Sequence, residues 1–298
     1  MGIVLGAGYY LGQQSMQGHT QAVTQRPSKH LSPHSPTPQQ TAVEHNEAGF
    51  GLEGMIEKLQ QKKAQKEKRQ ERAKAAVTPH RGKRPKLVII IDDISQPWQL
   101  KALQALSYHI TPSIFPPTAQ AKRSYKLAYG LRHYMVHLPM QSGNAKMNRM
   151  QGMIRVDDTA KRIEKRIKEI RRLFPKARFI NNHTGSRFTA NYPAMKRLYG
   201  YLREEGFIFV DSRTTGSTKV KRIAKEYGDR YIVRDVFIDN TQSVPYIHKQ
   251  LAKAVKTAKK RGYAIAIGHP HKTTFKALAS AKGILKGVDV VYIDELYR

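Results

Sequence analysis

The sequence of 298 residues contains no cysteine and one tryptophan, and it has only 22 Asp and Glu against 53 Lys and Arg. The absence of cysteine excludes a disulfide scaffold, a thiolate metal site and a cysteine nucleophile, and it leaves the redox compartment open. The shortage of acidic residues gives a formal net charge of +31. A protein this basic attracts polyanions such as nucleic acid, anionic lipid or acidic glycan, without selecting among them.

Long hydrophobic runs are also missing. The opening segment MGIVLGAGYYLG (residues 1–12) is apolar, but a membrane span needs about 20 such residues. We therefore predict no transmembrane helix in this chain. No basic residue precedes the segment, so it is either a frayed terminus or the end of an export signal or envelope anchor. The sequence also contains no P-loop, dinucleotide-binding glycine motif or Gly-x-Ser-x-Gly motif.

Composition divides the chain into three regions. Residues 1–54 are rich in Gln, Ser, Thr, Pro and His, which predicts a disordered segment that includes any remnant of a signal or anchor. Residues 55–85 are rich in basic residues and helix formers, which predicts a solvated basic helical spacer. Residues 86–298 form the predicted folded domain.

Short apolar runs alternate with amphipathic segments in this domain. The predicted strands cover residues 87–91, 114–115, 134–138, 177–181, 207–210, 231–238, 263–267 and 288–293. The predicted helices begin at Asp157 or Asp158, Asn191, Ser217, Ser243, and Thr273 or Thr274. Strands that alternate with helices favour a parallel sheet, and seven or eight such units favour a closed or distorted (β/α) barrel.

Polar residues follow most of the predicted strands. They are Asp92-Asp93, His137, Asn181-Asn182-His183, Asp211-Ser212-Arg213, Arg234-Asp235 and His269. The carboxyl ends of barrel strands share one mouth, so we expect these groups to converge there. A carboxylate with two imidazoles is a typical ligand set for zinc or a similar divalent ion. Taken singly, each group has a simpler explanation, such as a helix cap, a buried core histidine, a turn or a structural ion pair.

Six motifs in this order resemble the divergent polysaccharide deacetylase family of bacteria. They are IIIDDI (89–94), HLPM (137–140), NNHTGSRFT (181–189), VDSRTT (210–215), RDVFIDN (234–240) and IGHPHKTT (267–274). The resemblance implies the distorted (β/α)7 barrel of polysaccharide deacetylases. It also implies an amide hydrolase that uses a divalent metal, usually zinc, to remove acetyl groups from glycans. The sequence has Ser95 and Gln141 where the family usually has Gly and Glu.

The resemblance also assigns roles to individual residues. Asp92 corresponds to the general base and His269 to the general acid. Asp93 corresponds to the metal-binding aspartate, His137 stands where the family's relatives have a histidine pair, and His183 is the natural replacement for the missing second histidine. Groups expected to orient these from behind are Asn182, Ser186, Asp211, Arg213, Arg234 and Asp235.

Three functions remain in competition on the sequence alone. The first is a metal-dependent deacetylase-like hydrolase acting on an acetylated cell-envelope polysaccharide, which would place the protein in the periplasm or cell envelope. The second is a non-catalytic glycan- or envelope-binding protein on the same fold, whose basic surface holds anionic envelope polymers. The third, a nucleic-acid binder, rests on charge alone, because no DNA- or RNA-binding motif is present.

Overall fold

The computed structural model describes residues 52–75 and 84–297. Residues 1–51 of the predicted disordered segment therefore lie outside the described residues, and they include the opening apolar segment. Helix α1, Leu52–Ala75, begins three residues before the predicted basic helical spacer, inside the predicted disordered segment, and covers the spacer as far as Ala75. Among the described helices, none has the length and apolar character needed to cross a membrane.

The sheet and the remaining helices belong to one compact unit, residues 60–298. The nine strands are β1 (Lys86–Ile94), β2 (Thr111–Ile114), β3 (Met135–Met140), β4 (Phe179–Thr184), β5 (Ile208–Asp211), β6 (Ile232–Val233), β7 (Val236–Phe237), β8 (Tyr263–Gly268) and β9 (Asp289–Val291). The α-helices are α2 (Pro97–Gln104), α3 (Ala160–Leu173), α4 (Ser186–Ala190), α5 (Tyr192–Glu204), α6 (Val220–Glu226), α7 (Val244–Arg261), α8 (Lys272–Ala279) and α9 (Ile293–Leu296). Two 3-10 helices, η1 (Ser124–Ala128) and η2 (Ala145–Met147), flank β3.

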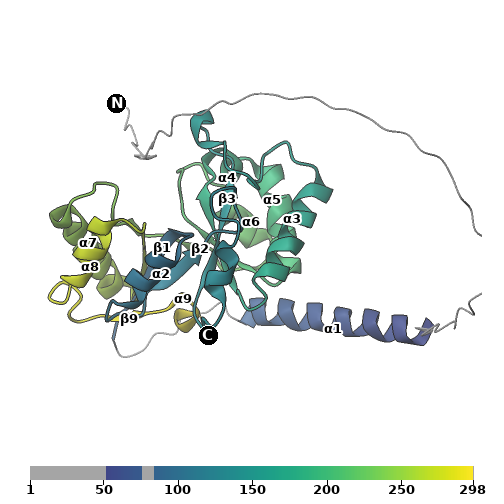
Figure 1. Ribbon diagram of the computed structural model, residues 1–298, viewed down its shortest axis with the longest axis horizontal. Helices are drawn as coiled ribbons and strands as arrows, with labels where there is room; N and C mark the ends of the chain where they lie inside the picture. The colour runs from purple at the N-terminus through teal and green to yellow at the C-terminus, as the bar shows by residue number, and fades with distance from the viewer. Residues whose placement is uncertain (1–51, 76–83, 298) are drawn as a thin grey trace, which may run out of the picture. The chain divides into compact units, whose positions relative to one another are not determined.

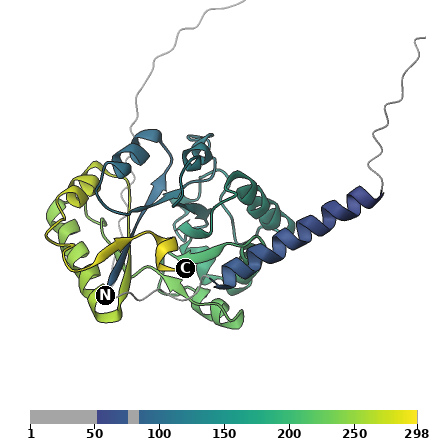
Figure 2. The same ribbon diagram turned by 90° about the horizontal axis from the view of Figure 1, so that it is seen from below.

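Eight strands form one path in the order β6-β5-β4-β3-β2-β1-β8-β7, and β9 pairs with β1 beside it. Every ladder is parallel. The sheet curls into a half-barrel. Within the described residues no ladder joins β6 to β7, so this half-barrel stays open. The predicted α/β barrel class is confirmed in this open form, with helices packed around the strands (Figures 1 and 2).

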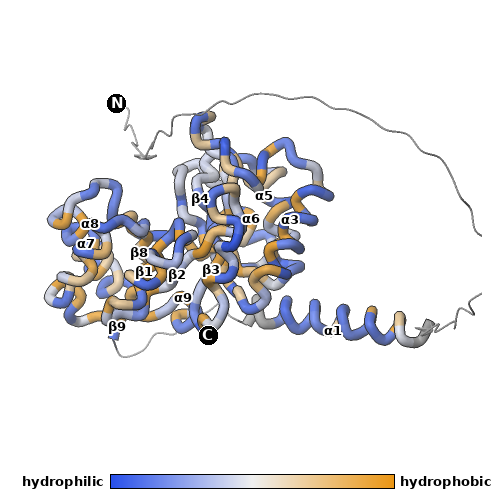
Figure 3. The backbone as a smooth tube through the Cα atoms, in the orientation of Figure 1, coloured by the Kyte–Doolittle hydropathy of each residue, from blue (hydrophilic) through white to orange (hydrophobic). Residues whose placement is uncertain are grey.

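Apolar residues on both faces of the central strand explain this arrangement. In β1, Leu87, Ile89 and Ile91 pack into the outer core beneath the helices, while Val88 and Ile90 pack into the inner core of the half-barrel. Successive strand residues point to opposite faces, so an uninterrupted apolar run is buried only when both faces are covered. Figure 3 shows the strands of the sheet as largely hydrophobic, whereas α1 is largely hydrophilic.

The last helix closes the inner core at the end of the sheet opposite the polar groups. Tyr297, which caps α9, packs on Phe179 and Tyr263, the first residues of β4 and β8. The amide of Ile293 donates to the Thr111 hydroxyl at the start of β2 (3.0 Å). The carboxyl ends of the strands are therefore left as the accessible end of the half-barrel.

Some helix starts differ from the prediction. Asn191 caps α5 as expected, accepting from the Ala194 amide. Helix α3, in contrast, is capped by Thr159, because the Asp158 carboxylate is engaged by the Arg155 amide and the Arg162 guanidinium. Helix α6 begins at Val220, three residues after the predicted Ser217.

The predicted strand over residues 231–238 is two short strands, β6 and β7. Arg234 interrupts it by donating from its guanidinium to the carbonyls of Ser212 and Arg213. Asp235 interrupts it as well, because its carboxylate accepts from the Ile265 amide in β8. The segment thus leaves one edge of the sheet and joins the other.

Candidate active site

Two consecutive aspartates leave β1 at a bulge. The pairing with β2 shifts between Ile91 and Ile94, so three steps on β1 match two on β2. Asp93 lies in the left-handed region at φ 60°, which aspartate tolerates better than most residues. Because the bulge changes the alternation of side chains, both carboxylates reach the same imidazole. Asp92 Oδ1 is 3.4 Å from His137 Nδ1, and Asp93 Oδ1 is 3.1 Å from His137 Nε2.

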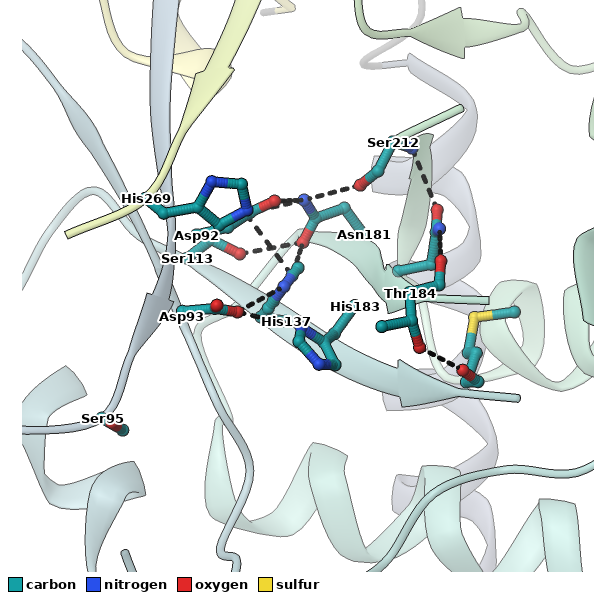
Figure 4. Close-up of polar contacts among 12 residues, drawn as sticks. Asp92, Asp93, Ser95, Ser113, His137, Asn181, His183, Thr184, Ser212 and His269 are labelled. Atoms are coloured by element: carbon teal, nitrogen blue, oxygen red, sulfur yellow. Dashed lines mark hydrogen bonds and ion pairs between the residues drawn. The ribbon is translucent and has the colours of Figure 1, made fainter. Parts of the chain in front are cut away.

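The three predicted metal ligands lie together. Asp93 comes from β1, His137 from the middle of β3 and His183 from β4, and their potential ligand atoms lie within 4.8 Å of one another. His183 Nδ1 is 2.9 Å from the Asp93 oxygen that also faces His137. Figure 4 shows the two imidazoles turned toward Asp93. Both histidines are buried, whereas the Asp93 side chain is 32% exposed and gives access from outside.

The cluster fits a divalent metal by its donor chemistry. One carboxylate and two imidazoles are three of the four ligands of a catalytic zinc site, which keeps its fourth position open. Buried polar atoms are nearly always hydrogen-bonded, yet His183 Nε2 is buried with no partner in the described part of the chain. Phe115 covers the two imidazoles, with ring centroids 5.0 Å from His137 and 4.9 Å from His183.

Asn181 connects the cluster to the strands around it. Its amide nitrogen donates to both oxygens of Asp92 (2.8 and 3.0 Å) and to the Ser212 hydroxyl (3.1 Å). Its amide oxygen accepts from the Ser113 hydroxyl and from His137 Nδ1, each at 2.8 Å. An amide oxygen only accepts, so His137 carries a hydrogen on Nδ1 and offers Nε2 to a metal.

A third imidazole, His269, lies at the carboxyl end of β8. Its Nδ1 is 3.0 Å from Asp239 Oδ1, and its backbone amide donates to Asp239 Oδ2 (2.6 Å). The Thr274 hydroxyl donates to the same Oδ2 (2.9 Å), so Thr274 supports Asp239 from within α8 instead of beginning that helix. The buried Asp239 thus holds both the backbone and the ring of His269.

The charges of this cluster shift three pKa values. Burial alone would raise the pKa of Asp93, but the field of His183 and hydrogen bonds from His137 and His183 lower it well below its usual range. Burial alone would lower the pKa of His137, and the carboxylates of Asp92 and Asp93 raise it instead. His269 behaves likewise, because Asp239 and the other two carboxylates raise its pKa to about 9. His269 is therefore protonated at neutral pH.

Among the predicted orienting groups, two act on the segment that follows β5. Asn182 Oδ1 accepts from the Ser212 amide (2.9 Å), and Arg234 Nε donates to the Ser212 carbonyl (2.7 Å). Ser212 is the residue whose hydroxyl accepts from Asn181. Asn182 and Arg234 are therefore connected to Asp92 through three successive contacts, by way of Ser212 and Asn181.

The other predicted orienting groups bond elsewhere. Asp211 accepts from the Arg213 amide and from the Thr218 and Tyr231 hydroxyls, and burial raises its pKa. Ser186 accepts from the Gly143 amide. Arg213 is in the left-handed region at φ 49°. Asp235 forms an ion pair with Arg261, and its carboxylate accepts from the Ile265 amide. Ile265 lies in β8, four residues before His269. Gln141, at the predicted Glu position, accepts from the Val156 amide.

Sequence reasoning assigns no specific role to two residues of the site. It places Asn181 among the polar groups at the strand ends, with a turn as the simpler explanation, whereas in the structure Asn181 is fully buried and bridges four side chains. It also passes over Asp239, because the run 231–238 predicts a single strand and its polar pair Arg234-Asp235 is the expected site contribution of that segment. The signal for Asp239 is the same one that identifies Asp92, namely an acidic residue directly after an apolar run.

The contact between Asp239 and His269 makes the pKa of His269 testable. In metal-free protein, Asp239→Asn is expected to lower this pKa from about 9 by more than one unit, toward the ordinary value near 6.5. Because the pKa in the folded state is the raised one, its contribution to the free energy of unfolding is lost as the pH rises through 9. NMR titration of the imidazole measures the shift. Asp294→Asn, which removes the carboxylate beside His133, is the control and should leave the pKa of His269 unchanged.

The fold and the site together define the class of protein: an open parallel α/β barrel that carries a candidate Asp-His-His metal site at the carboxyl ends of its strands. A sequence profile of the family described as "Divergent polysaccharide deacetylase" matches residues 89–297. The chain belongs to this family, as its motifs predict.

Known relatives extend the comparison without naming an activity. An uncharacterized protein of Haemophilus influenzae is 32% identical over 219 residues, which cover 72% of this chain and 77% of the relative. The uncharacterized protein YibQ of Escherichia coli is 32% identical over 195 residues, covering 65% of this chain and 61% of YibQ. The crystal structure of an uncharacterized protein from Agrobacterium tumefaciens has the same fold, with a TM-score of 0.64 at 19% identity, covering 76% of this chain and 94% of that one.

Proposed function

We propose that the protein is a metal-dependent hydrolase that removes acetyl groups from a bacterial cell-envelope polysaccharide. The observation that carries the proposal is the meeting of Asp93, His137 and His183 at the accessible end of the half-barrel, with Asp92 in contact with His137. The family assignment supports a glycan as the substrate class, and an envelope glycan supports the periplasm or cell envelope as the location.

The ligands would be Asp93, His137 Nε2 and His183, and a divalent ion, zinc in the first instance, would polarise the acetamide carbonyl and acidify a water molecule there. Asp92 is the proposed general base and accepts a proton from the attacking water. Hydrogen bonds from Asn181 to both carboxylate oxygens hold Asp92 in a fixed orientation for this step.

His269 is the proposed general acid. Its imidazolium, favoured by Asp239, donates a proton to the nitrogen of the departing amine as the C–N bond breaks. The oxygen from water ends in acetate, and the glycan keeps the free amine. Asp239 holds the ring and stabilises its charge while His269 changes protonation state.

Asp92→Asn tests this assignment. We expect the variant to bind metal as the wild type does and to release acetate from N-acetylated oligosaccharides about a hundredfold to ten-thousandfold more slowly. Acetate release and metal content per chain are measured on the same preparations. Asp157→Asn is a matched control, because Asp157 is exposed and lies outside the cluster. Wild-type turnover in Asp92→Asn would contradict the role of Asp92. Glycan binding by the wild type with no acetate release would favour the non-catalytic alternative.

A further inference from the structure

A long stretch of the chain is basic without any acidic residue. Between Asn240 and Val288 the sequence has nine lysines and Arg261, and no Asp or Glu. Arg261 is paired with Asp235. In the described part of the chain, none of the nine lysines has a carboxylate oxygen within the 4.0 Å that defines an ion pair. Residues 52–75 and 84–297 therefore supply no ion-pair partner for the charges of these nine lysines.

Four of these lysines form one line along α7. The spacing of Lys249, Lys253, Lys256 and Lys260 is four, three and four residues, which places them on a single face of the helix. All four are exposed. At 1.5 Å per residue the line is about 16 Å long. The opposite face of α7 is buried through Ile247, Leu251, Ala254 and Ala258, so the line faces solvent.

Helix α8 extends this surface toward the candidate active site. His248 of α7 lies 2.9 Å from the Ala277 carbonyl and 3.1 Å from the Ser280 hydroxyl, which fixes α8 beside α7 (Figures 1 and 2). Lys272 and Lys276 are exposed on α8. Lys272 follows His269 by three residues, at the carboxyl end of β8. We call these six residues the lysine face: Lys249, Lys253, Lys256, Lys260, Lys272 and Lys276.

Another basic helix, α3, differs from α7 because some of its charges are paired within the helix. Helix α3 is also rich in Lys and Arg, but Glu164 pairs with Lys168 and Glu169 pairs with Arg166 on its surface. Like charges three or four residues apart destabilise a helix by about 0.2–0.5 kcal/mol per pair. Helix α7 keeps this repulsion along its whole outer face, which is explained when an external anion neutralises it.

We propose that the lysine face binds an acidic polysaccharide, whose chain runs along α7 and α8 toward the mouth of the half-barrel. This inference rests on the proposed function in one respect, namely that a glycan is the molecule that enters the mouth of the half-barrel. The surface suits carboxylates of variable position, because lysine is a flexible point charge. Nucleic acid is less suited, because its recognition uses arginine and stacking aromatic side chains. Among the described residues, α7 and α8 present no unpaired arginine and no large exposed aromatic side chain.

The test compares two variants of equal net charge in the full chain. The first replaces Lys249, Lys253, Lys256 and Lys260 by glutamine. The second, the matched control, replaces four exposed lysines on other helices by glutamine: Lys161, Lys165, Lys221 and Lys225. Binding to polygalacturonate is measured over a range of salt concentrations, with neutral dextran as the uncharged polymer.

We expect the α7 variant to bind polygalacturonate at least tenfold more weakly at low salt, with a smaller slope of log Kd against log salt concentration. The control should lose less than threefold, and dextran should bind neither protein. The melting temperature of the α7 variant should equal or exceed that of the wild type, because like-charge repulsion is removed. An equal loss in the control would overturn the proposal, as would tighter, α7-dependent binding of single-stranded DNA of matched charge.

The outcome is independent of turnover. His183→Ala, which removes a proposed metal ligand, should bind polygalacturonate like the wild type. The α7 variant should hydrolyse a short neutral acetylated oligosaccharide at the wild-type rate. Loss of polymer binding in the α7 variant, together with no acetate release from any protein, would sustain the lysine face and reject the proposed function.

Discussion

Replacing His183 by alanine is expected to abolish stoichiometric binding of a divalent metal and to lower the rate of acetate release about a thousandfold or more. Only Asp93 and His137 of the ligand cluster remain in this variant. Two ligands hold a divalent ion far more weakly than three, and a buried Nδ1 contact to Asp93 is lost as well. Metal content after dialysis against a trace of zinc measures the first effect directly, without reference to activity.

Thermal unfolding gives a second measure of the same site. A metal that binds only the folded state raises the melting temperature as its concentration rises. The proposed site therefore predicts that zinc raises the melting temperature of the wild type in proportion to the logarithm of its concentration and does not do so for His183→Ala. His133→Ala is the control, because His133 is bonded to Asp294 and stacked on Tyr292, away from the cluster. Full metal occupancy in His183→Ala, or an equal loss in His133→Ala, would contradict the assigned ligands.

The parts of the fold that could be predicted are those determined by local sequence. The apolar run of β1 is buried on both faces, so hydropathy alone located it. Asn191 and Gly262 mark helix ends through their own side chain and backbone conformation. The start of α3 could not be predicted in the same way. Asp158 and Thr159 are both competent caps, and only the contact of Asp158 with Arg155 and Arg162 decides between them.

The same distinction holds at the site. Asp93, His137 and His183 could be grouped from the sequence because each lies in or at the end of a strand in a parallel sheet, where carboxyl ends share one edge. Asn181 is grouped with them by the same reasoning, but its bridging role could not be predicted, because its four partners come from four different segments of the chain. Asp239 was obscured by the neighbouring Arg234-Asp235 pair, which breaks one apolar run into two strands.

Asn181 should be the largest single contributor to stability in the site. Asn181→Leu keeps a similar volume but leaves the buried Asp92 carboxylate without its hydrogen-bond donor, and it removes the partner of the Ser113 and Ser212 hydroxyls. Loss of a partner to a buried charge costs about 3–5 kcal/mol. Urea unfolding of the metal-free protein should show this loss in the free energy of unfolding. Asn191→Ala, which removes the cap of α5, is the comparison at about 1 kcal/mol.

Asn181→Asp separates this explanation from simple loss of packing. The variant keeps the shape of the side chain but places a second carboxylate against Asp92, which is buried. Two buried carboxylates in contact raise the pKa of one of them above its value in the unfolded chain. The folded state then binds a proton that the unfolded state does not, so the variant should lose stability relative to the wild type as the pH rises. The difference in the free energy of unfolding should therefore be smaller at pH 5 than at pH 8, whereas for Asn181→Leu it should change much less. A difference for Asn181→Asp that is independent of pH would contradict the contact between residue 181 and the Asp92 carboxylate.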